Sequence, residues 1–404
     1  MRLLQINTII NSGSTGRIAE EIGLRIIEKG GDSYIAFGRR AERPSRSYKI
    51  QIGNKRDILV HGIGTRLTDR HSLFSKRATE KLILQITRIN PDIIHLHNIH
   101  GYYLNIEILF NYLSSVNTPV VWTFHDCWPI TGHCTHFSYI DCAKWKTHCE
   151  KCPQKKEYPA SYLMDNSFKN FQYKKDLFTS VNNMTIVPVS NWLAQIIKDS
   201  FLNKYPIKVI HNGVDINVFK PHNNVSLLNR YQIENKFILL GVANVWNKRK
   251  GLQDFIELNN LLSVDEIIIL VGLNKQQIKS LPKNIIGIER TENISHLIEL
   301  YSLADIVLNL SFEETFGLTT IEGFACGTPG IVYNCTASPE LMSTETGFVV
   351  KQSNLEELRR AINEIKKNGK KSYSRACREY ALANFDKDVK YNEYIQLYNN
   401  LMKQ

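Results

Sequence analysis

Ser311-Phe-Glu-Glu-Thr-Phe-Gly-Leu-Thr-Thr-Ile-Glu-Gly-Phe-Ala-Cys-Gly-Thr-Pro329 is the stretch that decides the fold. One apolar run, residues 306–310, precedes it, and a second, residues 330–333, follows it. This order is typical of a buried strand, a polar turn, a helix, a Gly-Thr-Pro turn and the next strand. The sequence therefore predicts a βαβ unit, and with it an α/β fold built on a parallel sheet.

Two glutamates lie on either side of the expected helix start. Glu314 falls in the loop at the strand's carboxyl end, where open α/β sheets bind ligands, and Glu322 is expected about two turns into the helix. Between them, the N–H groups of residues 316–319 favour a phosphate. Because carboxylates repel phosphate, the pair suits a ligand with hydroxyls on both sides of a diphosphate, such as a nucleotide sugar. The alternative is that Glu314 caps the helix and Glu322 is solvated.

The complete string resembles the Glu-x7-Glu signature of the retaining glycosyltransferases of family 4. Those enzymes have the GT-B architecture, in which two Rossmann-like, doubly wound domains face a cleft. The resemblance implies that Glu314 is a catalytic-site residue that contacts the donor sugar, and that Glu322 contacts the ribose. The donor-binding residues that it assigns in this stretch are Phe316, Gly317, Leu318, Thr319 and Glu322.

A basic loop, Lys248-Arg-Lys-Gly251, follows the apolar run 237–242. Cations at a strand's carboxyl end can neutralise a leaving diphosphate, although an ordinary basic loop has the same composition. Family 4 enzymes have an arginine five residues before the lysine of Lys-Gly, where this chain has Val245. The resemblance therefore assigns donor binding to Lys250, with Arg249 as the substitute for the missing arginine.

The chain begins with an expected strand, a glycine-rich turn, Asn11-Ser-Gly-Ser-Thr-Gly-Arg17, and an amphipathic helix. Gly13 and Gly16 would let the backbone approach a phosphate closely, although a plain tight turn gives the same pattern. Family 4 members carry a glycine-rich loop at this place. The resemblance therefore counts Gly13 and Gly16 as donor-binding residues.

Histidines lie at the ends of two further expected strands. Asp92-Ile-Ile-His-Leu-His97 places His95 and His97 on one face, and we favour polar-network histidines there over a metal site. The strand 119–124 ends in His125-Asp126, where a neutral imidazole can bond a sugar hydroxyl and the aspartate can fix its tautomer. Both strand ends resemble family 4 motifs. The resemblance makes His125 a catalytic residue supported by Asp126, and places His97 on the acceptor side.

Residues 127–165 interrupt the alternation of expected strands and helices, and they contain five of the eight cysteines. Cys149 and Cys152 have the C-x2-C spacing of a zinc site, and Cys134 and Cys142 would complete four thiolates, although their own spacing is too long. Structural zinc and reduced thiols remain equal alternatives, with disulfides third because we expect a cytoplasmic protein. With its Trp, Thr-Gly and Cys-Pro elements, this insertion resembles the colanic-acid and O-antigen branch of family 4.

Composition limits the class of protein. The 404 residues suit two domains, and no apolar run of about 18 residues is long enough to span a bilayer. The first residues turn polar too early for a secretory signal, so we expect a cytoplasmic location. The net charge of +11 comes from scattered lysines without a nucleic-acid motif, so we expect no nucleic acid. A solvated surface or a peripheral contact with the anionic inner face of the plasma membrane explains the charge.

We expect three segments: an acceptor-side domain over 1–212 that includes the insertion, a nucleotide-sugar domain over 213–385, and a terminal helix over 386–404 that crosses back to the first domain. Within the first domain, a polar stretch separates a strand over 32–38 from a helix over 78–89.

The resulting hypothesis is a retaining glycosyltransferase. It would move sugar from a nucleoside diphosphate sugar to a lipid-linked glycan in bacterial surface polysaccharide synthesis, without a catalytic metal or other cofactor because no Asp-x-Asp metal motif follows an expected strand. The alternatives are a catalytically silent, zinc-stabilised binding subunit and a GT-B nucleotide-sugar epimerase.

Overall fold

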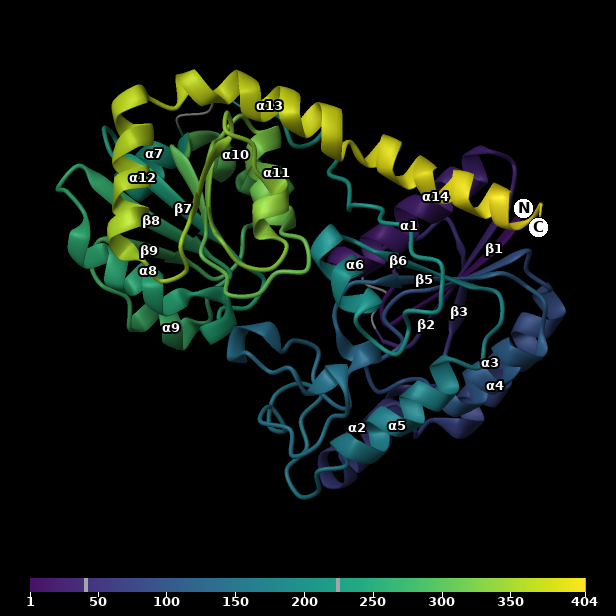
Figure 1. The fold of residues 1–404 in the computed structure, drawn as a ribbon. Coiled ribbons are helices and arrows are strands. Elements are labelled where there is room, and N and C mark those ends of the chain that lie inside the picture. Colours follow the sequence, from purple (N-terminus) through teal and green to yellow (C-terminus); the bar gives the residue numbers. More distant parts are fainter. Residues whose placement is uncertain (40–42, 223–225, 404) are drawn as a thin grey trace. The chain divides into compact units, whose positions relative to one another are not determined.

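A computed structural model describes residues 1–39, 43–222 and 226–403. The chain divides into two compact units, Met1–His211 with Tyr391–Gln404, and Asn212–Lys390 (Figure 1). Residues 223–225 of the expected second domain and residue 404 of the expected terminal helix lie outside the described residues.

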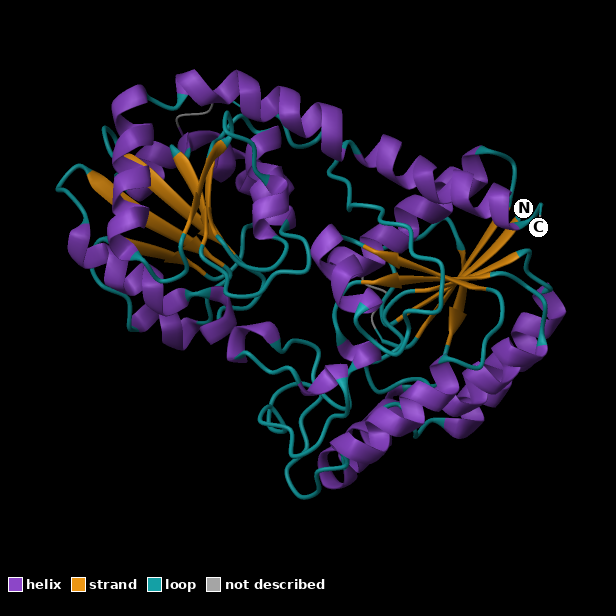
Figure 2. Ribbon diagram, viewed as in Figure 1, coloured by secondary structure: helices purple, strands orange, loops and turns teal. Residues whose placement is uncertain are grey.

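The first unit contains a six-stranded sheet in the order β3-β2-β1-β4-β5-β6, with every neighbouring pair parallel (Figure 2). The buried strands are runs of apolar residues, as expected for a sheet that is covered on both faces. The strands are β1 (Arg2–Asn7), β2 (Asp32–Phe37), β3 (Tyr48–Gln51), β4 (Ile93–Leu96), β5 (Val120–Phe124) and β6 (Met184–Pro188).

Helices cover this sheet. In α1, Ile18, Ile22 and Ile26 recur at every fourth position, and they pack in one core cluster with Tyr394 and Tyr398 of α14. The helices of the first unit are α1 (Gly13–Glu28), α2 (Lys55–Thr68), α3 (Lys76–Ile89), α4 (Ile106–Ser115), α5 (Ser167–Phe178) and α6 (Asn191–Lys198), and α14 (Lys387–Leu401) runs into this unit from the second.

The segment between β2 and α3 differs from the polar stretch that we expected, because it contains β3 and α2. The apolar residues of α2 face outward, so the segment lacks the usual pattern of a helix that packs on a core. Residues 127–165 form no α-helix or strand and contain three short 3₁₀ turns. This segment is an irregular insertion between β5 and α5.

The second unit repeats the architecture with the strand order β12-β11-β10-β7-β8-β9, again parallel throughout. Its strands are β7 (Phe237–Val242), β8 (Glu266–Val271), β9 (Ile285–Ile288), β10 (Ile306–Asn309), β11 (Gly330–Tyr333) and β12 (Gly347–Val350). Its helices are α7 (Ser226–Tyr231), α8 (Leu252–Leu258), α9 (Lys275–Lys279), α10 (Ile294–Leu303), α11 (Leu318–Ala325), α12 (Leu355–Asn368) and α13 (Lys371–Phe385). The predicted βαβ unit is confirmed as β10, α11 and β11.

In each sheet, the second strand in chain order lies on one side of the first strand, and the fourth strand lies on its other side. The strand order therefore reverses between the first and fourth strands. These neighbours are β1 and β4 in the first unit, and β7 and β10 in the second. The loops that leave the carboxyl ends of such a pair diverge, and the crevice between them is the usual ligand site of a doubly wound sheet. The predicted site residues of the first unit come after β1, β4 and β5. Those of the second unit come after β7 and β10.

Candidate functional site

The loop after β7 in the second unit presents Lys250 toward β10. Asn247 caps the 3₁₀ turn Lys248–Lys250, with its side chain accepting a hydrogen bond from Lys250 N at 3.2 Å. Gly251 then takes a left-handed conformation with φ of 71°, and a Cβ on it would lie 2.0 Å from the carbonyl oxygen of Leu310. Only glycine lets this loop lie so close to the end of β10.

Lys250 and Glu314 form an ion pair at this point. Ser311 Oγ also donates to Glu314 Oε1 at 2.9 Å, and the backbone N–H of Glu314 donates to Thr336 Oγ1 at 2.9 Å. Burial alone would raise the pKa of Glu314, but the charges of Lys250 and Arg249 outweigh it and hold this pKa below its usual value. Glu314 is therefore an ionised carboxylate that is 9% exposed.

Arg249 lies beside the same carboxylate. Its Nη1 donates to the backbone oxygen of Glu313 at 2.6 Å, while Val245, at the position of the family's arginine, is 63% exposed. Arg249 is thus close enough for its positive charge to lower the pKa of Glu314. Its assignment as a substitute for the missing arginine stays a prediction.

The glycine-containing turn before α11 completes this half of the site. Gly317 precedes Leu318, the first helical residue, with φ of 105°. Residues 316–319 therefore span the helix start as predicted, but Glu322 is the fifth helical residue, about one turn into α11 rather than two. The difference arises because the left-handed glycine delays the start of the helix.

Glu322 and Glu314 are not the solvated and capping residues of the alternative interpretation. Tyr301 of α10 donates its hydroxyl to Glu322 Oε2 at 2.8 Å, and Glu322 is 9% exposed. Glu314 accepts from Lys250 and Ser311, whereas the N-cap residue of α11 is Gly317. Both carboxylates are held in place by neighbouring side chains.

In the first unit, the glycine-rich turn forms the start of α1. Gly13 has φ of 58°, and the N–H of Asn11 donates to Gly16 O at 3.1 Å. Ser12, the N-cap residue, makes no capping hydrogen bond, and among the described residues its buried Oγ has no partner. Sequence reasoning did not single out Ser12, although a serine at an N-cap is a common signal.

A hydrogen-bonded chain connects β1, β4 and β5. Gln5 donates its amide NH₂ to Ala19 O at 2.7 Å, so its Oε1 accepts from Nε2 of His97 at 3.0 Å. Nδ1 of His97 therefore accepts the proton of His125 Nε2 at 3.1 Å. Burial holds the pKa of His97 well below its usual value and lowers that of His125 to about 4, so both rings are neutral.

Asp126 does not have the expected role of fixing the tautomer of His125, which the Gln5–His97 chain sets. Its Oδ2 pairs with Nε2 of His100 at 2.8 Å, and its Oδ1 accepts from the N–H of Trp128 at 2.9 Å. Burial would raise the pKa of Asp126, but His100 and the Trp128 N–H lower it to about 2. Both residues lie in the bend that follows β5, where the N–H of Trp128 holds Asp126.

Comparison with known proteins supplies the family. Residues 15–218 match the model described as Glycosyltransferase Family 4, and residues 227–383 match Glycosyl transferases group 1. The first match alone covers just over half of the chain. The chain belongs to glycosyltransferase family 4.

Two curated family relatives have names related to surface polysaccharides. One is the putative colanic acid biosynthesis glycosyl transferase WcaC of Escherichia coli, 27% identical over 54% of this chain and 55% of that protein. The other is the O-antigen chain mannosyltransferase RfbU of Salmonella typhimurium, 24% identical over 48% of this chain and 53% of that protein. The chain spans about half the length of these two relatives.

A solved structure confirms the GT-B fold of this family 4 chain. It is that of HepE from Anabaena in complex with UDP-glucose, which is 16% identical, with a TM-score of 0.71, and covers 99% of this chain and 100% of that chain. At this level of identity, the likeness concerns the fold alone.

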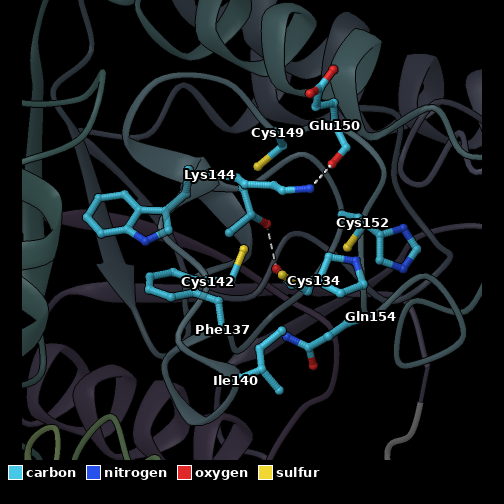
Figure 3. Close-up of a pocket in the computed structure, with 13 residues that line it drawn as sticks. Cys134, Phe137, Ile140, Cys142, Lys144, Cys149, Glu150, Cys152 and Gln154 are labelled. Atoms are coloured by element: carbon cyan, nitrogen blue, oxygen red, sulfur yellow. Dashed lines mark hydrogen bonds between the residues drawn. The ribbon is translucent and has the colours of Figure 1, made fainter.

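The insertion of this family 4 protein gathers the four predicted cysteines around one small pocket (Figure 3). None of the eight cysteines, all of which the structure describes, forms a disulfide, and Cys134 donates to Cys152, which lowers the pKa of Cys152 to about 7. Across residues 1–39, 43–222 and 226–403, no three His, Cys, Asp or Glu side chains are arranged to hold a metal ion. Zinc at Cys134, Cys142, Cys149 and Cys152 stays a prediction, which metal analysis of the purified protein tests.

Lys174 of α5 anchors the insertion, and sequence reasoning missed it. Its Nζ donates to the backbone oxygens of Trp128 and Thr131 at 2.8 and 2.9 Å, and lies 3.4 Å from the centroid of the Trp128 ring. Burial lowers its pKa to about 7. No signal marks this lysine in the sequence, because exposed lysines of α5 occupy neighbouring positions.

Proposed function

We propose that this protein is a retaining glycosyltransferase that transfers sugar from a nucleoside diphosphate sugar to a lipid-linked oligosaccharide in bacterial surface polysaccharide synthesis. The observation that carries the proposal is the buried Lys250–Glu314 ion pair at the switch point of the second sheet, beside the start of α11. The complex of HepE with UDP-glucose supports a nucleotide-sugar donor. The names of WcaC and RfbU support a surface-polysaccharide product.

In the proposed reaction, the bond between the anomeric carbon and the diphosphate breaks. A hydroxyl oxygen of the acceptor bonds to that carbon from the same face, and its proton passes to the departing phosphate oxygen. Lys250, Arg249 and the N–H groups at the start of α11 stabilise the charge that develops on the diphosphate. A divalent ion is not needed because these fixed groups supply the positive charge.

The carboxylates would recognise hydroxyls. An ionised carboxylate is a hydrogen-bond acceptor only, so Glu314 suits the donor sugar and Glu322 the ribose. The ion pair with Lys250 holds Glu314 in its charged form before the donor arrives. Tyr301 donates to Oε2 of Glu322 and so orients this carboxylate for the proposed contact with a ribose hydroxyl.

His125 would accept a hydrogen bond from a sugar hydroxyl. The chain through Gln5 and His97 places its proton on Nε2, so Nδ1 is the acceptor nitrogen of its neutral ring. Asp126 would help to position the residues after β5 through its hydrogen bond with His100, rather than through His125. The resulting prediction is that His125 contacts substrate and Asp126 is a positioning residue.

Thermal unfolding with UDP, GDP, ADP, CMP and their sugar conjugates tests the donor site. A ligand at 100 times its dissociation constant adds about 2.7 kcal/mol of stability. We expect one nucleoside diphosphate to raise the melting temperature and Glu322→Ala to abolish the shift. The exposed Glu345→Ala is the matched control and should keep the shift. The donor assignment fails if no nucleotide stabilises the wild-type protein.

Product analysis separates the reactions. A glycosyltransferase releases the nucleoside diphosphate together with a glycosylated lipid acceptor, and Glu314→Ala should strongly reduce that release. Release of the nucleoside diphosphate without an acceptor product would instead identify the epimerase alternative.

A further inference from the structure

Helix α2 has an inverted distribution of apolar and polar residues. Its buried residues are His61, Gly62 and Thr65. Four large apolar side chains face outward, with exposed fractions of 62% for Leu59, 63% for Val60, 48% for Ile63 and 46% for Leu67. A helix on the surface of a water-soluble domain normally buries such a stripe and exposes its polar face.

Polar contacts fix α2 in this orientation. The N–H of Ser72 donates to Nε2 of His61 at 3.0 Å, so Nδ1 of His61 carries the proton and donates to Ser75 Oγ at 2.8 Å. A capping box between Asn54 and Asp57 holds the first turn. Since these contacts would break if the helix rotated, the apolar face is held outward.

The segment before α5 extends the apolar face. The N–H of Tyr162 donates to Arg66 O at 2.8 Å, and that of Met164 donates to Leu67 O at 3.3 Å. These bonds join residues 162–164 to the last turn of α2. In Figure 1, α2 and α5 are drawn close together. We call the resulting set the α2 surface, and it comprises the exposed side chains of Leu59, Val60, Ile63, Leu67, Tyr162, Leu163 and Met164.

Basic residues border the α2 surface. Lys55, Arg56 and Arg66 of α2 are exposed. Next to Met164, a pocket is lined by Arg70, Lys76 and Lys169, against one acidic residue, Glu107, among the described lining residues. Glu107 already accepts a hydrogen bond from Tyr173, another residue of this lining. The border therefore has a net positive charge that suits phosphate groups.

We propose that the α2 surface docks on a bilayer that contains anionic phospholipid. Its apolar side chains enter the boundary between headgroups and acyl chains, and Arg70, Lys76 and Lys169 contact lipid phosphates. At 14 residues, α2 is too short to span a bilayer, and none of the described helices has the length and apolar content to do so. The helix therefore lies in the plane of the interface.

Charge favours this occupant over a second copy of the chain. A two-fold dimer through the α2 surface would place its basic border against an identical basic border, in a chain that already carries +11. An anionic bilayer offers the opposite charge together with an apolar layer. The inference deepens the proposed function, because docking there would bring the enzyme to a lipid-linked acceptor.

Vesicle co-sedimentation of the full chain tests the proposal. Vesicles of phosphatidylcholine alone are compared with vesicles of equal parts phosphatidylcholine and phosphatidylglycerol. We expect binding to the anionic vesicles and about tenfold weaker binding for Leu59→Ser/Ile63→Ser, because each change removes apolar area from the interface. Leu261→Ser/Val264→Ser alters exposed apolar residues of the second unit and is the matched control, which should bind like the wild type.

A second pair of variants tests the charges. Lys76→Glu/Lys169→Glu should bind anionic vesicles at least about tenfold more weakly at low salt, whereas Lys275→Glu/Lys283→Glu, which makes the same charge change on exposed residues of the second unit, should have a smaller effect. Equal losses in both pairs would overturn the specific site and leave only a nonspecific effect of net charge.

Three other outcomes would overturn the proposal: no binding of the wild type to anionic vesicles, equal binding of the Leu59→Ser/Ile63→Ser variant, or a wild-type dimer that this variant converts to monomers. The nucleotide-induced thermal shift is measured on the same samples. Lost vesicle binding with an intact nucleotide response confines the effect to docking. Vesicle binding by a wild-type protein that no nucleotide stabilises would instead remove the proposed function and leave the docking surface standing.

Discussion

Glu314 is a charged side chain in a site that is nearly closed to water, and its charge depends on Lys250. Isolated buried carboxylates protonate, because burial disfavours the ionised form. Here Lys250, Arg249 and the Ser311 hydroxyl oppose that tendency and lower the pKa of Glu314. The same contacts that keep Glu314 ionised therefore also fix the position of its carboxylate.

Lys250→Ala should reduce both donor binding and stability. Removing one partner of a buried ion pair leaves the other uncompensated, which typically costs about 3 kcal/mol or more. We expect urea unfolding to show this loss and the pKa of Glu314 to rise. The double variant Lys250→Met/Glu314→Gln removes both charges and should recover most of the stability without recovering transfer. A single variant as stable as the wild type would mean that the pair contributes little.

At the scale of elements, two contacts hold loops in place: Gly251 lies beside the end of β10, and Lys174 of α5 binds the start of the insertion. Both contacts join segments that are far apart in the sequence. Each one fixes a loop that follows a strand carboxyl end, which is where the predicted site residues lie.

Gly251→Ala should displace the loop that carries Lys250. The new Cβ would lie 2.0 Å from Leu310 O, in addition to the strain of a positive φ. Gly30→Ala is the control because its φ is similar, at 78°, and nothing lies within 4 Å of its Cβ. Strain alone costs about 1–2 kcal/mol, so we expect that loss in the control and a larger one, with weaker nucleotide binding, in Gly251→Ala. Equal losses would show that the contact with Leu310 relaxes freely.

Lys174→Met should loosen the insertion. The backbone oxygens of Trp128 and Thr131 would lose a buried donor, and each unsatisfied group costs about 1–3 kcal/mol. We expect lower stability in urea and faster proteolysis within residues 127–165. Lys175→Met changes the exposed neighbouring lysine and should leave both measurements unchanged. Unchanged proteolysis of Lys174→Met would show that other contacts hold the insertion.

At the scale of the whole molecule, the first unit contains several buried histidines that are neutral. Burial lowers the pKa of His61 to about 3 and of His125 to about 4, and holds those of His71, His95 and His97 well below 6.5. Unfolding returns each ring to water, where its pKa is near 6.5. The unfolded chain therefore binds more protons than the folded chain in mildly acidic solution.

This difference predicts that acid destabilises the protein. The folded-state pKa values are depressed, so the stabilisation is present above pH 6.5 and declines as the pH falls from about 6.5 toward 4. Well below pH 6.5, each such histidine should contribute about 1.4 kcal/mol per pH unit. Urea unfolding at several pH values measures the slope, and His125→Gln should reduce it by one histidine's share. A flat profile between pH 6.5 and 4.5 would contradict the burial of these rings as neutral groups.

The sequence by itself determined the fold class and the location of the candidate site residues relative to the strands. Apolar runs mark buried strands, and the polar residues that follow them mark strand carboxyl ends, so local pattern placed Glu314, Lys250 and His125 at strand ends. Their predicted roles came from the resemblance to family 4. Local pattern is sufficient there because strand and helix periods depend on neighbouring residues.

Only the tertiary structure decided which side chains meet. Asp126 pairs with His100, Tyr398 reaches His95 across 303 positions, and Lys174 holds Trp128. The outward apolar face of α2 was also invisible in the sequence, because polar contacts made by His61 orient this helix. These partners are brought together by packing between distant segments, and no periodicity along the chain records such a contact.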